Sequence, residues 1–170
     1  ISYGKISSMP FFYWVDQNVN GRFYTSYIDL YRLHVSSNYE WQINELVNIH
    51  SSFNFYNYDT LAANKEGING NLGVSLNLDE KIKFSTSLSY IGKKQSLKGY
   101  LNSDSSYLVD WADTYEINSK LHANIYIDYN YSESLAGYLR INNILNSKQE
   151  LWQGYQEIGI NGWVGISYSF

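Results

Sequence analysis

The last thirteen residues of the chain, 158–170, alternate between apolar and small or polar side chains and stop on an aromatic residue. The apolar set consists of Ile158, Ile160, Val164, Ile166, Tyr168 and Phe170, with Gly162 at the remaining position. An alternation of period two predicts a β-strand with one apolar face. At about 3.3 Å per residue this strand extends about 43 Å, which crosses an apolar layer about 25 Å tall even at a tilt of about 40°. The end of the chain is therefore predicted to span a membrane as a strand.

The composition also favours strands in a membrane over an ordinary soluble domain. Aromatic residues make up 18% of the 170 residues. No stretch approaches about 18 consecutive apolar residues, so no transmembrane helix is predicted. A net charge of −4 provides no basic face for nucleic acid, and the absence of cysteine rules out a disulfide framework. The length is that of a single domain, residues 1–170.

Seven other segments show the same alternation. The fold class predicted for the chain is therefore all-β: a transmembrane, antiparallel up-and-down β-barrel with about eight strands in this chain. The additional strands are expected at 5–16, 23–35, 39–57, 68–78, 82–90, 115–131 and 135–145. Arg140 is assigned to the lumen, because an arginine at the bilayer midplane costs about 2–4 kcal/mol on the lipid face.

The strand expected at 5–16 contains Pro10 just before an apolar run, which marks a bulge, an edge or a shortened strand. Two further strands depart from strict alternation. Glu45 falls on the lipid face of the strand expected at 39–57, and we interpret it as a bulge or a position near the interface. Ile28 and Leu30 have the wrong parity within 23–35. We interpret this second departure as a register change in the middle of the strand.

Three motifs near the C-terminus resemble the end of TonB-dependent outer-membrane receptors. They are Asn143-Ile-Leu-Asn146, followed by Gly154-Tyr155, and the closing Tyr168-Ser-Phe170. The final strand, through Ile166, Tyr168 and Phe170, also resembles the signal by which the barrel assembly machinery of diderm bacteria recognises its clients. The resemblance implies a multi-pass barrel in the bacterial outer membrane with a role in transport. It implies outer-membrane lipid and the assembly machinery as partners, and it places Phe170 at the periplasmic edge.

With Phe170 in the periplasm, the connections alternate between short and long as outer-membrane barrels require. Tight periplasmic turns are predicted at Ser37-Asn38, Asp79-Glu80 and Ser132-Glu133. Longer extracellular loops are predicted at 17–22, 58–67, 91–112 and 146–157. All seven connections then fall on consistent sides of the membrane.

The length leaves two interpretations of the barrel open. Receptors of the TonB-dependent type resemble one another in having a plug and a barrel of 22 strands, whereas residues 1–170 supply about eight strands and no plug domain. The chain then contributes the C-terminal strands of a barrel that takes up or binds an extracellular ligand, with the remaining strands, a plug or a surface-exposed protein as partners. The alternative is a complete eight-stranded barrel with an adhesion, structural or complex-subunit role. Short inward side chains on 68–78, 82–90 and 160–170 favour the wider barrel, because a small lumen must be filled by side chains.

Candidate functional residues lie in the lumen and in the extracellular loops. A lumen charge network is predicted from Glu116, Lys120, His122, Asp128 and Arg140. Extracellular ligand contacts are predicted at Tyr100, Tyr107, Trp111, Trp152 and Tyr155, whose rings could stack on sugars or dock a partner. Alternatively, Trp111 and Trp152 belong to the aromatic girdle at the membrane interface. Lys93, Lys94 and Lys98 could contact lipopolysaccharide phosphates or form a solvated face.

Motifs for catalysis or for metal binding are nearly absent from the sequence. His34, His50 and His122 lie on different predicted strands without the spacing of metal ligands, so no metal site is predicted. A set such as Ser87, His122 and Asp128 carries no weight, because serine is frequent on the inward faces. The chain is predicted not to be an enzyme and to need no cofactor.

Overall fold

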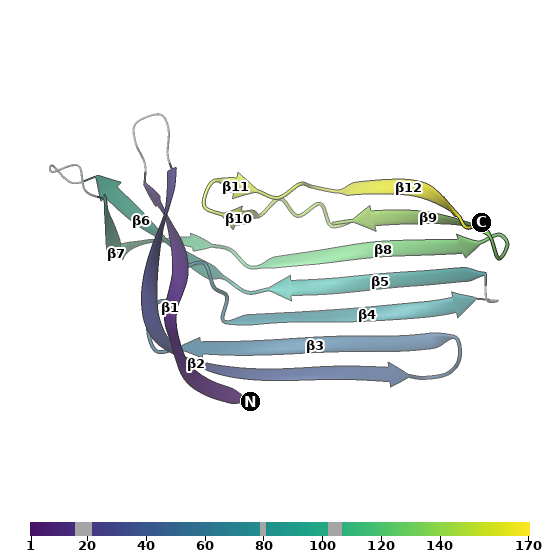
Figure 1. Cartoon of the computed structure of the whole chain (residues 1–170), viewed down its shortest axis with the longest axis horizontal. Helices are drawn as coiled ribbons and strands as arrows, with labels where there is room; N and C mark the ends of the chain where they lie inside the picture. Colours follow the sequence, from purple (N-terminus) through teal and green to yellow (C-terminus); the bar gives the residue numbers. More distant parts are fainter. Residues whose placement is uncertain (16–21, 79–80, 102–106) are drawn as a thin grey trace.

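The computed structural model of the chain describes residues 1–15, 22–78, 81–101 and 107–170. Within these ranges it contains twelve β-strands, labelled in Figure 1. They are β1 (Ser2–Val15), β2 (Arg22–Gln42), β3 (Val47–Tyr58), β4 (Ile68–Leu78), β5 (Ile82–Ile91), β6 (Lys94–Leu101), β7 (Tyr107–Ile117), β8 (Lys120–Asn130), β9 (Leu135–Asn142), β10 (Glu150–Trp152), β11 (Tyr155–Gln156) and β12 (Asn161–Tyr168). None of the described segments forms a helix long and apolar enough to cross a membrane.

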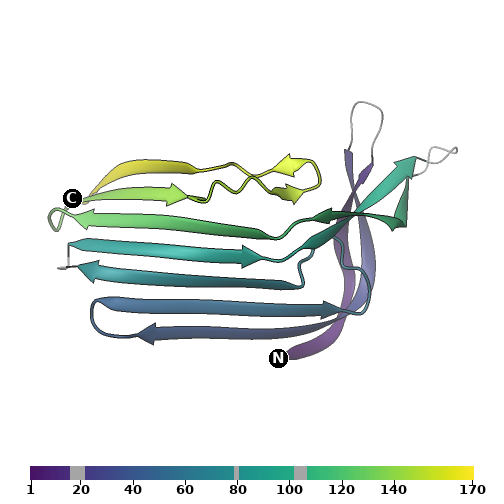
Figure 2. The same ribbon diagram turned by 180° about the vertical axis from the view of Figure 1, so that it is seen from behind.

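Eight strands form one antiparallel meander, in the order β12-β9-β8-β5-β4-β3-β2-β1. The turns β2–β3 and β8–β9 lie at one end of the sheet together with the C-terminus, and we call this the turn end (Figure 2). We call the opposite end, which carries β6, β7, β10 and β11, the hairpin end. The β6–β7 hairpin continues the sheet beyond β1 through a short parallel pairing of β1 with β6. The prediction of an all-β, barrel-type fold is confirmed, and the sheet formed by the described strands is open.

The two faces of the meander differ as the alternation predicts. One face exposes large apolar side chains from adjacent strands, and Leu72 pairs directly with Leu88. The set includes Phe53, Leu72, Leu88, Leu121 and Leu139. The other face carries short polar side chains that hydrogen-bond between strands. Asn71 donates to Ser89 at 2.6 Å, and Asn124 donates to Ser87 at 3.1 Å. Burying the polar groups against one another leaves the apolar face free for lipid.

A lipid-facing charge should separate these two faces experimentally. We expect Leu88→Arg to destabilise the folded protein by about 2–4 kcal/mol, because the guanidinium would enter the apolar layer. Ser87→Arg is the matched control, since its side chain starts from the polar face. Both variants are compared by denaturant unfolding of the full polypeptide in lipid vesicles. Equal loss of stability would contradict the assignment of the faces.

The predicted turn at Ser37-Asn38 is wrong. Both residues lie within β2, and the chain reverses at 43–46 instead. The side-chain oxygen of Asn44 accepts hydrogen bonds from the backbone nitrogens of Leu46 and Val47, at 2.9 and 2.8 Å, which stabilises the turn. Glu45 therefore lies in the turn, in water, and the proposed bulge or interfacial position within a strand is not needed.

The register change predicted within 23–35 is also misplaced. β2 is continuous, and the irregularity lies in β1 between Ile6 and Met9, where Ser8 has a φ of 54°. Ile28 and Leu30 keep the parity of the inner face because they pack into an apolar core there. Inward-facing positions can therefore carry apolar side chains near the hairpin end.

The strand predicted at 115–131 is two strands, separated at 118–119. Residues 115–117 end β7, and the side chain of Ile117 is buried rather than facing lipid. The predicted loop at 91–112 contains β6 and part of β7. The final strand is shorter than predicted, since residues 158–160 belong to the connection that precedes β12.

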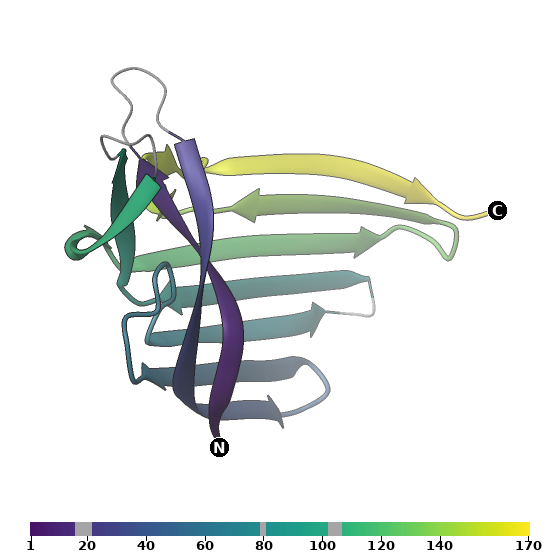
Figure 3. The same cartoon turned by 60° about the vertical axis from the view of Figure 1, so that its left-hand side comes forward.

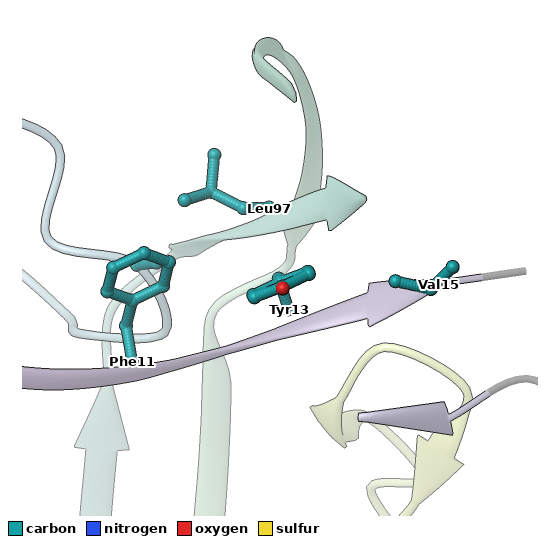
Figure 4. Close-up of a cluster of buried hydrophobic side chains, with 5 residues drawn as sticks. Phe11, Tyr13, Val15 and Leu97 are labelled. Carbon is teal, nitrogen blue, oxygen red and sulfur yellow. The ribbon is translucent and has the colours of Figure 1, made fainter. Parts of the chain in front are cut away.

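The hairpin end has a hydrophobic core of its own. The β1–β2 hairpin runs across this end of the sheet towards β10 and β11 (Figures 1 and 3). On its inner side Phe11, Tyr13 and Val15 bury against Leu97 of β6 and Ala63 (Figure 4). Burial raises the pKa of the Tyr13 hydroxyl. A second cluster joins Met9, Leu30 and Ala62.

The β10–β11 hairpin also contacts β1 and β7 at the hairpin end. The Tyr115 hydroxyl of β7 donates a hydrogen bond to the Glu150 carboxylate of β10, and this bond raises the pKa of Tyr115. The rings of Phe12 in β1 and Trp152 in β10 meet edge to face at 5.5 Å. Segments that are distant in sequence are thereby joined above the sheet, which shapes the pockets described next.

Candidate functional site

Cationic and aromatic side chains gather on the inner face of β2 and β3, close to the hairpin end. The register pairs Arg32 with Tyr58 and His34 with Tyr56, so all four side chains share one face. The His34 ring stacks on Tyr56 with centroids 4.5 Å apart, and the Tyr58 ring follows at 6.3 Å from Tyr56. The guanidinium carbon of Arg32 lies 5.7 Å from the centre of the Tyr56 ring. This distance is within the range of a cation–π interaction.

A chain of hydrogen bonds fixes the orientation of this aromatic group. Nε2 of His34 lies 3.0 Å from the side-chain oxygen of Asn54, whose amide donates to the Asn69 oxygen at 2.9 Å. The Asn69 amide donates to Glu66 at 3.0 Å. Because an amide oxygen can only accept, Nε2 of His34 carries the proton in this arrangement. The bonds cross three strands and hold the His34 ring against Tyr56.

Two pockets adjoin this group and share Tyr56, Tyr58 and Lys65. They have volumes of about 390 and 330 Å³. Their linings contain four cationic and two acidic side chains, which gives a net charge of +2: Arg32, Lys65, Lys93, Lys94, Glu66 and Glu116. The site is therefore positive although the whole chain is negative.

Ion pairs in the pockets neutralise only part of this charge. Nζ of Lys93 lies 2.8 Å from the Glu116 carboxylate, which raises the pKa of Lys93. Nζ of Lys94 lies 3.8 Å from Glu66. Within the described ranges, neither Arg32 nor Lys65 lies in an ion pair with a carboxylate. These two cations are the groups available to an anionic ligand.

The structure divides the predicted lumen charges into three separate groups. Arg140 pairs with Asp128 and lies over the rings of Tyr126 and Tyr138. At the hairpin end, Lys120 and His122 both contact Glu157, at 2.5 and 2.6 Å. Glu116 pairs with Lys93 outside both groups. Sequence analysis did not assign Glu157 or Lys93 to the charge network, because both lie in segments that it predicted as loops.

The predicted ligand-contact aromatics are distributed over two places. Trp152 and Tyr155 line an open pocket of about 370 Å³ together with Phe12 and Phe23, two residues that sequence analysis did not select. Trp111 packs instead on Phe11, with ring centroids 5.3 Å apart. The side chains of Tyr100 and Tyr107 lie outside the described part of the structure.

The three lysines proposed for lipopolysaccharide contact all have acidic neighbours. Lys93 and Lys94 pair with Glu116 and Glu66, and Lys98 pairs with Asp113 at 2.9 Å.

At the turn end, the side chains of the predicted assembly signal lie exposed along β12 and just beyond it, at Ile166, Tyr168 and Phe170. The rings of Tyr168 and Phe170 pack edge to face at 5.2 Å.

Comparison with known proteins gives likeness in structure alone. No family model matches the sequence, and no curated protein does. The structure of the copper transporter OprC matches with a TM-score of 0.70, at 9% identity, over 99% of this chain and 28% of that one. The ferripyoverdine receptor of the outer membrane of Pseudomonas aeruginosa, bound to ferripyoverdine, matches with a TM-score of 0.67, at 10% identity, over 85% of this chain and 20% of that one. The complex of FpvAI with pyocin S2 gives a TM-score of 0.67 at 10% identity, over 86% of this chain and 20% of that one.

These matches confirm the predicted resemblance at the level of fold. The chain has the fold of barrel strands in TonB-dependent outer-membrane receptors. It spans between a fifth and somewhat over a quarter of the length of the matched structures. Its open sheet corresponds to part of such a barrel.

Proposed function

We propose that this chain supplies the C-terminal strands of an outer-membrane barrel of the TonB-dependent receptor type, and that this barrel takes up or binds an extracellular ligand. The observation that carries the proposal is an open meander with one apolar face, matched over most of its length by receptor barrels. The proteins matched are a copper transporter and a ferripyoverdine receptor, neither of them an enzyme by its name.

The strand edges favour a larger barrel over a complete barrel of eight strands. Among the described strands, β12 pairs with β9 alone, and residues 35–42 of β2 pair with β3 alone. Unpaired backbone groups in lipid cost several kcal/mol each, so both edges require further strands. Closure of β12 on β1, which the eight-stranded alternative needs, does not occur among these strands.

The pockets lie where an extracellular ligand would arrive. Arg32, Tyr56 and Lys65 line the inner face near the hairpin end, and Trp152 and Tyr155 lie in the β10–β11 hairpin at the same end. In the proposed orientation this end faces outward and Phe170 faces the periplasm. A ligand arriving from outside would meet both pockets at this end.

Single cysteines test the orientation, since the chain contains none. In intact cells that produce the full polypeptide, we expect Tyr155→Cys to react with a membrane-impermeant maleimide. Ser134→Cys, exposed at the turn end, should react only after the outer membrane is permeabilised. Energy-dependent depletion of a low-mass compound from the medium, measured by mass spectrometry against cells lacking the protein, tests uptake. Labelling of both cysteines in intact cells, or no depletion, would overturn the proposal.

A further inference from the structure

Two arginines on the inner face lie over tyrosine rings, but only one of them is neutralised. Arg140 lies 5.5 and 5.2 Å from the rings of Tyr126 and Tyr138, and Asp128 pairs with it. Arg32 lies over Tyr56 in a similar way. No described carboxylate pairs with Arg32. A half-buried guanidinium without a counter-ion is unusual, because its desolvation is then uncompensated.

The acid that shares a pocket with Arg32 is engaged elsewhere. One carboxylate oxygen of Glu66 accepts from Asn69, and the other faces Lys94. Lys65, on the same loop, lines both pockets and adds a second cation. The planar fork of an arginine suits acid groups that present two oxygens side by side, such as carboxylates and sulfonates.

The remaining walls of this pocket suit a flat apolar body. Tyr56 and Tyr58 lie nearly parallel, at 17°, and Ile6, Met9 and Pro10 complete the lining. Conjugated rings pack on tyrosine faces in offset stacks, which contribute about 0.5–1.5 kcal/mol beyond buried area. The pocket thus combines cationic groups with aromatic walls within about 390 Å³.

We propose that this pocket binds an anionic ligand that carries a planar ring, with its acid group on Arg32 and Lys65 and its ring against Tyr56 and Tyr58. The inference rests on the proposed function, because it identifies the class of ligand that the receptor takes. The hydrogen-bond chain from His34 to Glu66 orients the His34 ring, and this ring stacks on Tyr56 and holds it in position.

The test uses the full polypeptide in outer-membrane vesicles and two fluorescent probes of one shape. Pyrene-1-sulfonate is anionic, and 1-pyrenemethylammonium is cationic. We expect the wild type to bind the sulfonate at least about tenfold more tightly, since a charge-assisted hydrogen bond contributes that much. Arg32→Gln should reduce this preference, because Lys65 alone then holds the acid group, and Tyr56→Leu should weaken the binding of both probes.

Control variants separate this pocket from other cations and rings. Arg140→Gln and Lys98→Gln remove cations that are already paired, and should leave the preference for the sulfonate unchanged. Trp152→Ala opens the aromatic pocket that Trp152 forms with Phe12, Phe23 and Tyr155. This pocket has no charged lining residue, so the variant should leave the preference for the sulfonate unchanged. Equal affinity for the two probes, or an unchanged preference in Arg32→Gln, overturns the inference. The same results are expected, and the inference is equally overturned, if another part of the full polypeptide covers Arg32.

The two proposals fail in different ways. The proposed function fails if the cysteines at positions 155 and 134 show no sidedness, or if no compound is taken up. The ligand inference fails if the protein is correctly inserted and takes up a compound, yet does not distinguish the two probes.

Discussion

Phe11→Ala is expected to destabilise the hairpin end by about 3–5 kcal/mol, the usual range for deleting a fully buried aromatic side chain. Only 2% of the Phe11 side chain is exposed, and it packs in one cluster with Leu97, whose exposure is 0%. The same cluster holds β1 against β6 where their parallel pairing is only three residue pairs long. Removing the ring should therefore release β6–β7 from β1 without opening the membrane-spanning sheet.

Hydrogen exchange followed by mass spectrometry measures this effect strand by strand. In Phe11→Ala the amides of β1 and β6 should exchange faster by more than about a hundredfold, while those of β4 and β5 stay unchanged. Phe12→Ala is the matched control, because Phe12 is 39% exposed and, among the described residues, its ring packs on Trp152. We expect it to cost about 1 kcal/mol. Uniform acceleration in all strands would show that the hairpin end is not a separate cooperative unit.

The membrane strands were predictable because the signal that defines them is local. In a lipid-facing strand every second residue is apolar, so parity alone places Leu72, Leu88 and Leu121 on one face. The hairpin end follows no such rule. Ile28 and Leu30 are apolar yet pack on the inner side with Met9 and Ala62, and Ile117 is buried although its parity predicts a lipid-facing position. Their contact partners depend on how the hairpins β1–β2, β6–β7 and β10–β11 pack against one another. The alternation within a single strand does not specify that packing.

The candidate pocket could not be predicted from the sequence because one turn was misplaced. A turn at Ser37-Asn38 would set Arg32 opposite residue 43, whereas the turn at 43–46 sets it opposite Tyr58. The alternation within 23–35 by itself puts Arg32 and His34 on one face. Only the correct register brings the rings of Tyr56 and Tyr58 beside them. Asn44, which accepts two backbone hydrogen bonds in the turn, was the available signal.

Glu157→Gln should detach the connection between β9 and β12 from the sheet. The side chain of Lys120 is 8% exposed and lies 2.5 Å from the Glu157 carboxylate. Breaking such a pair from one side costs about 3–5 kcal/mol, because the remaining charge stays buried and uncompensated. Glu157 lies next to β11 and Lys120 begins β8, so this cost falls on the attachment of β10–β11.

Cleavage by a lysine-specific protease at the exposed Lys148 reports this detachment. Glu157→Gln in the full polypeptide should be cut faster than wild type, whereas Glu133→Gln, exposed at the turn end, should be cut at the wild-type rate. The double variant Lys120→Met/Glu157→Leu removes both charges, and an apolar pair of similar volume is often as stable as the ion pair that it replaces. Recovery of resistance in the double variant would assign the effect to the buried charge. Rapid cleavage of both Glu157→Gln and the double variant would instead mean that hydrogen bonds specific to Glu157 hold the connection. An unchanged cleavage rate in Glu157→Gln would contradict the predicted attachment.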